Sequence, residues 1–123
     1  MPIIRPADAT VHTVHGSTFT SFAAPSRGSA QLCAWQLTVP VGLRGAAHRP
    51  TREEVMLLLE GELTITLDGT AADLAPGDVV LVPAGSELRV DGGTSGATAW
   101  VTTTCGLEAV MADGSRIAPP WAN

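Results

Sequence analysis

Residues 63–69 read Leu-Thr-Ile-Thr-Leu-Asp-Gly, and this stretch decides the fold class. Apolar and polar side chains alternate strictly over residues 63–67, which is the period of a β-strand with one buried and one wet face. Asp68-Gly69 follows at once, and this dipeptide tolerates the positive φ angles of a two-residue hairpin turn. The stretch therefore predicts a strand that enters a tight hairpin.

Similar turn signals recur along the rest of the chain, and the runs between them are short and rich in Val, Leu, Ile and Thr. They lie at residues 25–28, 40–42, 60–61, 68–69, 76–78, 83–85, 91–93 and 113–114. Many short strands separated by Gly and Pro indicate an all-β sandwich or barrel. Residues 51–54 resemble a helix capping box, but such a helix would have to end at Gly61 after about two turns. We expect a loop that enters a strand there, and at most one short helix in the chain.

The composition narrows the classes of function. A length of 123 residues predicts one domain over residues 1–123, and 45% hydrophobic with 15% charged residues argues against disorder. A net charge of −5 disfavours binding to nucleic acid or to an anionic membrane. The chain contains no Lys and no Tyr, which excludes a lysine Schiff base and a phenolic general acid.

The two cysteines and the N-terminal stretch point to one compartment. Cys33 and Cys105 form no CxxC pair, so we interpret both as reduced, small buried side chains. Residues 1–6 carry no apolar run and no cleavage signal. We therefore expect a cytoplasmic protein.

Two glycine-rich stretches carry a recognisable spacing. The first places Gly42, His48, Pro50, Glu54 and Gly61 with five, one, three and six residues between them. The second begins fifteen residues after the first ends. It places its residues with five, one, two and three residues between them: Gly77, Pro83, Gly85, Leu88 and Gly92.

These stretches resemble the two motifs of the cupin superfamily, with Pro50 and Leu88 where histidines are expected. The resemblance implies a double-stranded β-helix, or jelly-roll barrel, with a cavity at one mouth. It also implies a homodimer formed by pairing of sheets. Cupins hold a divalent transition metal with three histidines and one carboxylate, or with a reduced version of that set.

Only His48 and Glu54 match ligand positions of that set. Two protein ligands rarely hold a divalent metal tightly, because three is the usual minimum even in an open catalytic site. We therefore expect no metal cofactor. If a metal is bound, His48 and Glu54 are its ligands, and His12 or His15 is the candidate to complete the site.

His48 and Glu54 are also the candidate catalytic residues. An imidazole exchanges protons near neutral pH, and an apolar wall raises the pKa of a carboxyl group, so the two would form an acid–base pair. The alternative is an idle pair inherited from a lost metal site. The other candidate substrate-binding residues are expected on the cavity wall or at its mouth: Met56, Leu58, Leu88, Trp35 and Arg44. Residues 118–121 contain two prolines and are expected to lie across the barrel, with Trp121 as an anchor.

Three functions remain open at this stage. The first is a metal-independent enzyme that moves a proton on a small, largely apolar organic molecule, as an isomerase, cyclase or lyase. The second is a metal-dependent cupin, such as a dioxygenase, with a non-standard ligand set. The third is a non-enzymatic module that binds a small ligand.

Overall fold

The computed structural model describes residues 3–123, so Met1 and Pro2 of the N-terminal stretch considered above lie outside the described residues. Apart from three 3₁₀ turns, every regular element in residues 3–123 is a β-strand. The strands are β1 (Thr10–Val14), β2 (Ser17–Ala23), β3 (Leu32–Val39), β4 (His48–Pro50), β5 (Glu54–Leu67), β6 (Thr70–Leu74), β7 (Val79–Val82), β8 (Leu88–Thr104), β9 (Ala109–Met111) and β10 (Arg116–Ile117). The 3₁₀ turns are η1 (Pro6–Asp8), η2 (Pro25–Arg27) and η3 (Pro120–Ala122).

The hairpin predicted from residues 63–69 is confirmed. Leu67 of β5 pairs with Thr70 of β6, which leaves Asp68 and Gly69 as a two-residue loop. Their φ angles are 49° and 84°, and two successive positive values define a type I′ turn. Residues 51–53 form the expected loop, because β5 begins at Glu54.

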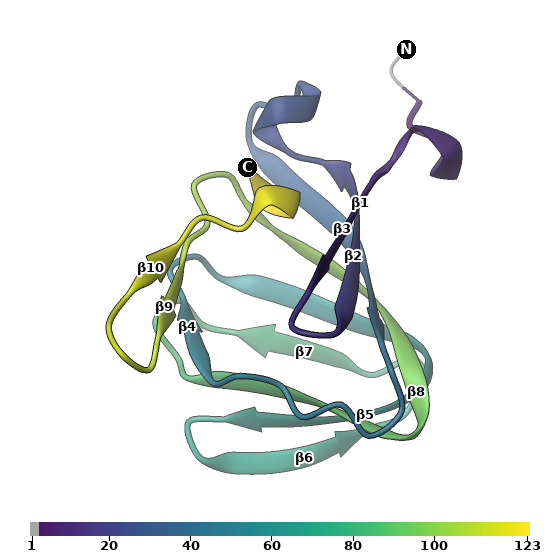
Figure 1. Cartoon of the computed structure of the whole chain (residues 1–123), viewed down its shortest axis with the longest axis vertical. Coiled ribbons are helices and arrows are strands. Elements are labelled where there is room, and N and C mark those ends of the chain that lie inside the picture. Colours follow the sequence, from purple (N-terminus) through teal and green to yellow (C-terminus); the bar gives the residue numbers. More distant parts are fainter. Residues whose placement is uncertain (1–2) are drawn as a thin grey trace.

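The barrel is a single antiparallel sheet curled on itself, as Figure 1 shows. Its main path runs β1-β2-β3-β8-β4-β9-β10, and β5 joins it by pairing with β8 along most of its length. β6 and β7 extend the sheet beyond β5. This is the all-β jelly-roll barrel that the motif spacing predicts.

Two predicted turns are wrong, because residues 60–61 and 91–93 lie inside the long strands β5 and β8. The β5–β8 register shifts around Gly61, so the glycine marks a bulge that bends a continuous strand. A Cβ on Gly61 would lie 2.0 Å from the carbonyl oxygen of Gly96, and one on Gly92 would lie 2.2 Å from that of Pro40. Glycine is therefore required by close backbone approach where the sheet curls.

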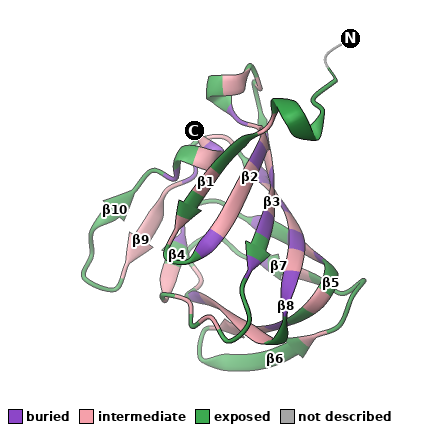
Figure 2. Ribbon diagram, turned by 45° about the vertical axis from the view of Figure 1, so that its right-hand side comes forward, coloured by how far each residue is buried: buried purple, intermediate pink, exposed green. Residues whose placement is uncertain are grey.

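The core lies inside the curl, where alternate residues of β3, β5 and β8 point inward (Figure 2). Cys33 belongs to this core, whereas Cys105 is only half-buried, which corrects the expectation that both cysteines are buried. The two Sγ atoms lie 3.6 Å apart. Burial, reinforced by the neighbouring Cys105 thiol, raises the pKa of Cys33 to about 12, so this thiol is inert near neutral pH. No helix within residues 3–123 has both the length and the apolar character needed to cross a bilayer.

The C-terminal segment crosses one end of the barrel, which agrees with its expected position. The Trp121 carbonyl oxygen accepts a hydrogen bond from Ser21 Oγ at 2.7 Å. The Ala122 carbonyl oxygen lies 3.3 Å from Cys33 Sγ, and Asn123 Nδ2 donates to the Leu107 carbonyl at 3.2 Å. These contacts join the segment to β2, β3 and the loop after β8.

Candidate functional site

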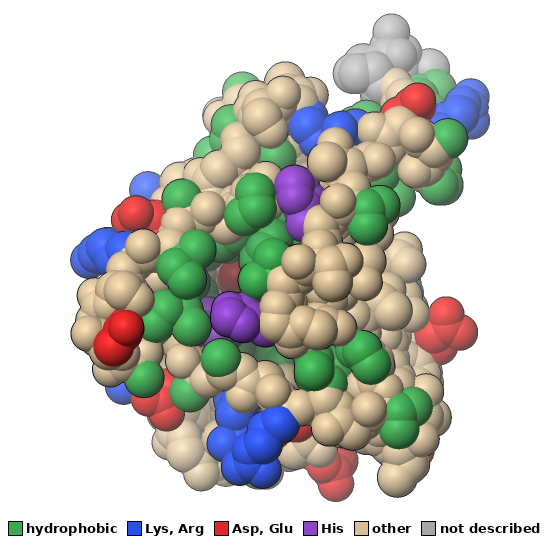
Figure 3. Space-filling model, viewed as in Figure 1, with side chains coloured by type: hydrophobic (Ala, Val, Ile, Leu, Met, Phe, Trp, Pro, Cys, Tyr) green, Lys and Arg blue, Asp and Glu red, His purple; other side chains and the backbone are tan. Residues whose placement is uncertain are grey.

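A cavity of about 160 Å³ opens at the end of the barrel crossed by the C-terminal segment. Figure 3 looks onto a hollow in this face, with hydrophobic side chains around it and histidine beside it. Its walls are mostly apolar and come from β1 to β5, β8, β9, β10, the loop before β4 and the C-terminal segment. The apolar lining includes Phe19, Trp35, Leu37, Val39, Leu43, Met56, Leu88, Val90, Val101, Leu107, Met111, Ile117 and Trp121.

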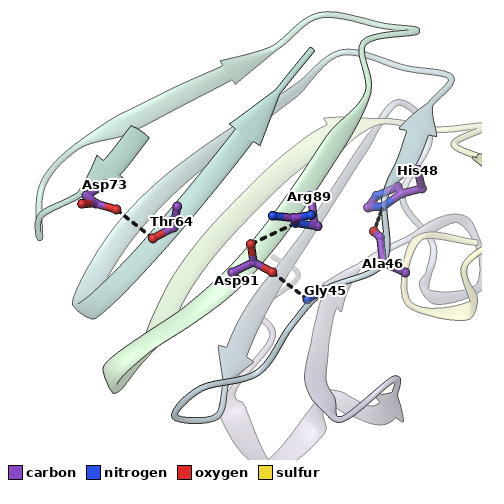
Figure 4. Close-up of polar contacts among 7 residues, drawn as sticks. All are labelled: Gly45, Ala46, His48, Thr64, Asp73, Arg89 and Asp91. Carbon is purple, nitrogen blue, oxygen red and sulfur yellow. Dashed lines mark hydrogen bonds and ion pairs between the residues drawn. The ribbon is translucent and has the colours of Figure 1, made fainter. Parts of the chain in front are cut away.

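His48 enters the cavity from the start of β4. Strand alternation turns His48 and Pro50 inward and leaves Arg49 exposed. The His48 Nδ1 atom lies 3.0 Å from the Ala46 carbonyl oxygen (Figure 4). A carbonyl oxygen only accepts hydrogen bonds, so Nδ1 carries the proton. In the neutral ring, Nε2 is then a free proton acceptor.

The loop before His48 is held against β8 by Asp91. The Gly45 N–H donates to Asp91 Oδ1 at 2.9 Å, and Arg89 Nε donates to Asp91 Oδ2 at 3.0 Å (Figure 4). The loop also lies directly on the β8 backbone, since a Cβ on Gly45 would be 2.2 Å from the Val90 carbonyl oxygen. This packing fixes the Ala46 carbonyl oxygen in the position where it accepts the hydrogen bond from His48 Nδ1.

Glu54 lines the same cavity from the first position of β5. It pairs across the sheet with Val82 of β7 and Thr103 of β8, and only 5% of its surface is exposed. Within residues 3–123 its carboxyl group makes no hydrogen bond or ion pair. Burial therefore raises the pKa of Glu54 from 4.5 to about 7, so that near neutral pH the protonated and ionised forms coexist.

Trp35 supplies a further polar group in the wall. Its side chain lines the cavity from β3 and is 3% exposed. Its Nε1–H is buried without a hydrogen-bond partner in the described part of the chain. A buried donor left unpaired costs about 1–3 kcal/mol, so this N–H favours any acceptor that comes within reach.

Two of the expected substrate-binding residues lie elsewhere. Met56, Leu88 and Trp35 line the cavity, but Leu58 does not. Leu58 does face inward, but it lies four residues beyond Glu54 and is completely buried in the core. Arg44 is exposed on the loop before β4 and does not line the cavity either.

A stacked pair of aromatic rings in the cavity wall was not expected as a unit. Phe19 of β2 and Trp121 stack with ring centroids 3.7 Å apart and an interplanar angle of 12°. Both rings line the cavity. Their contact joins segments about 100 residues apart in the chain. Nothing in the sequence around either residue predicts this contact.

Comparison with known proteins settles the family. The sequence model of the Cupin domain matches residues 35–104, which is more than half of the chain. The chain belongs to the cupin family.

Solved cupin structures share its fold at low sequence identity. A polyketide cyclase, RemF from Streptomyces resistomycificus, superimposes with a TM-score of 0.77 at 17% identity, over 87% of this chain and 81% of that one. An RmlC-like cupin from Shewanella frigidimarina gives 0.69 at 19% identity, over 80% and 85% of the two chains. An oxalate decarboxylase variant from Bacillus subtilis gives 0.73 at 15% identity, over 80% of this chain and 28% of that one.

One curated relative has higher identity but a short match. The endoribonuclease YbeY of Myxococcus xanthus is 37% identical over 76 residues. The match covers 60% of this chain, which spans only a quarter of the length of that relative.

The four cupin ligand positions converge on the cavity, but their side chains do not fit a metal. His48, Pro50, Glu54 and Leu88 all line it, and His48 pairs directly with Leu88 across β4 and β8. Proline and leucine supply no donor atom, which leaves one imidazole and one carboxylate.

The remaining histidines do not complete such a set. His15 lines the cavity from the β1–β2 turn, whereas His12 lies on β1 outside it. No group of three or more His, Cys, Asp or Glu residues within residues 3–123 is arranged to hold a metal ion. The described residues therefore do not provide the metal site that other cupins use.

Proposed function

We propose that this cupin is an enzyme that moves a proton on a small, largely apolar organic molecule, as an isomerase, cyclase or lyase, without a resident metal. One observation carries the proposal. A proton acceptor, His48 Nε2, and a carboxyl group with a pKa near 7, Glu54, line the same apolar cavity.

The two groups suit the two roles in acid–base catalysis, one as the general base and the other as the general acid. His48 is held with Nδ1–H on the Ala46 carbonyl, so Nε2 acts as the base that removes a proton from bound substrate. Glu54 in its protonated form acts as the acid that donates to a substrate atom gaining charge. The groups then exchange roles, and the proton returns at a different position or the product leaves.

The family relationships are compatible with this chemistry but do not decide it. A polyketide cyclase is among the proteins with the same fold, and cyclisation is a reaction that acid–base groups promote. Decarboxylase and dioxygenase activities also occur on the fold. The absence of donors at Pro50 and Leu88 favours the metal-independent class among these.

The test is hydrogen–deuterium exchange on ring-sized carbon acids. Acetophenone, phenylacetate and indene are each incubated with protein in D₂O, and loss of the C–H signal is followed by NMR. We expect exchange above buffer for at least one of the three. His48→Ala and Glu54→Gln should each lower that rate by on the order of 10²–10⁴, the usual weight of one positioned acid or base.

Matched control variants lie outside the cavity. His12→Ala and Glu53→Gln make the same substitutions at residues that do not line it, and both should keep the wild-type rate. Undiminished exchange in both His48→Ala and Glu54→Gln would reject the acid–base pair. No exchange above buffer on any of the three compounds would also reject it, and would favour a ligand-binding module.

A further inference from the structure

The cavity provides no fixed positive charge for an anionic ligand. The ionisable residues that line it are His15, His48, Glu54 and Glu108, with no arginine among them. Glu108 is already paired, since its Oε1 accepts from Arg116 Nη1 at 3.1 Å. With His15 and His48 in their neutral forms, a carboxylate in the cavity would lose its hydration and lie near Glu54 with no cation to bind it, which is unfavourable.

The size and the walls of the cavity suit one flat ring. A closed apolar cavity of about 150 Å³ accommodates benzene, and this cavity has a similar volume with an open mouth. The stacked Phe19 and Trp121 rings present an aromatic surface, and aromatic rings prefer to pack against one another. Met56 and Met111 add flexible thioether side chains that adapt to a ring edge.

The interior polar groups require an acceptor on that ring. Protonated Glu54 has one O–H to donate, and Trp35 has a buried N–H. Neither donor has a partner within residues 3–123. A carbonyl oxygen has two lone pairs and carries no net charge, so it satisfies both donors without bringing an anion into the cavity.

We propose that the cavity binds uncharged, ring-sized carbonyl compounds, with the ring against Phe19 and Trp121 and the oxygen accepting hydrogen bonds from Glu54 and Trp35. This assignment rests on the proposed function and specifies its substrate class. His48 Nε2 takes the proton from the carbon beside the carbonyl, and the C–H electron pair forms a C=C bond. The C=O π electron pair moves to the oxygen, which takes the proton of the Glu54 carboxyl group and becomes the hydroxyl of an enol, and the reverse steps regenerate the ketone.

Binding of three ligands of matched shape tests the substrate class without turnover. Acetophenone is an uncharged ketone, benzoate is an anion of similar size, and α-methylstyrene replaces the carbonyl oxygen by a CH₂ group. Each is titrated at pH 7, where part of Glu54 is still protonated, while the indole N–H resonances of Trp35, Trp100 and Trp121 are followed by NMR. We expect acetophenone to bind at least about tenfold more tightly than benzoate. It should bind about twofold to tenfold more tightly than α-methylstyrene, and it alone should move the Trp35 resonance strongly.

Variants separate the two donors from general packing. Trp35→Phe identifies the Trp35 resonance and should remove part of the preference for acetophenone, whereas Trp100→Phe, outside the cavity, should not. Glu54→Gln keeps a donor and should keep the preference over α-methylstyrene. Glu54→Met has similar length and no donor, and should lose part of that preference. This pair also tests the proposal if Trp35→Phe fails to fold.

The two proposals fail in different ways. Benzoate binding as tightly as acetophenone, or α-methylstyrene binding equally well, would overturn the substrate class. Proton exchange on the carbon acids is read separately. Acetophenone binding without proton exchange would support the proposed ligand class and overturn the proposed enzymatic function. Proton exchange on phenylacetate together with tight benzoate binding would support the enzymatic function and overturn the ligand class.

Discussion

At the scale of single residues, Glu54 links the stability of the barrel to pH. Its pKa is about 7 in the folded protein and 4.5 as an unperturbed side chain, so the folded state binds the proton more tightly. The contribution of Glu54 protonation to the free energy of unfolding is therefore complete below about pH 4.5 and is lost as the pH rises through 7. A shift of this size corresponds to about 3 kcal/mol.

We therefore expect Glu54→Gln to flatten the pH dependence of stability. Urea unfolding of the wild type should show a falling free energy of unfolding between about pH 5 and pH 8, and the variant should lose most of that slope. Glu53→Gln removes an exposed neighbouring carboxylate and should follow the wild type. Parallel pH profiles for wild type and Glu54→Gln would show that burial does not perturb this carboxyl group.

A second residue-scale prediction concerns Leu88. Because Leu88 pairs directly with His48 across the sheet, Leu88→His places an imidazole beside the two existing donors. Three donors are enough for a catalytic-type site, so Zn²⁺ affinity measured by calorimetry should rise by on the order of 100-fold. Leu88→Gln, polar but a poor zinc ligand, is the control. Wild-type protein that already binds Zn²⁺ as tightly as Leu88→His would contradict the metal-independent proposal.

Most of the residues that sequence reasoning placed correctly in the cavity are fixed by local spacing. His48, Glu54 and Met56 follow from motif spacing and strand alternation, which are short-range properties. Leu58 obeys the same alternation but is buried in the core and does not line the cavity, because the extent of the cavity depends on packing from other strands. The Phe19–Trp121 contact joins opposite ends of the chain, and one sequence carries no local signal for it.

At the scale of elements, turn chemistry explains both the correct and the incorrect predictions. Asp68-Gly69 gives a true hairpin because residues on both sides pair with each other. Gly61 and Gly92 look similar in sequence, yet they serve close approach between strands already paired with other partners. The residues around a glycine therefore do not show whether it serves a turn or a bend within a continuous strand.

The loop before β4 is the element on which the His48 tautomer depends. Asp91→Ala removes the acceptor for Gly45 N–H and for Arg89, so the loop and its Ala46 carbonyl should lose their fixed position. The ¹⁵N spectrum of the His48 ring should then change from one tautomer to a mixture of two.

The controls identify a positioning role for Asp91. Asp91→Asn keeps an acceptor oxygen for Gly45 N–H and should restore most of the single-tautomer signal. Asp73→Ala breaks a 2.8 Å hydrogen bond to Thr64 on the β5–β6 hairpin and should leave His48 unchanged (Figure 4). An unchanged tautomer in Asp91→Ala would show that β4 alone fixes the ring.

At the scale of the whole molecule, the outer face of β5 and β7 differs from an ordinary solvated surface. Val55, Leu59, Val79 and Leu81 are 41–60% exposed there, and Val55 faces Leu81 across the two strands. β7 pairs only with β5 in the described part of the chain, so an edge strand adjoins this apolar face. Contiguous exposed apolar surface beside a free edge favours association.

We propose that this face pairs with the same face of a second copy, because a self-complementary patch closes a twofold dimer. Light scattering at about 100 μM should give a dimer for the wild type and a monomer for Val79→Lys, since a buried unpaired ammonium is strongly unfavourable. Val11→Lys is a matched control, because Val11 on β1 is 61% exposed and Val79 is 60% exposed. It should remain dimeric. A monomeric wild type would show that there is no dimer. Dissociation by Val11→Lys but not by Val79→Lys would show that the dimer contact lies elsewhere.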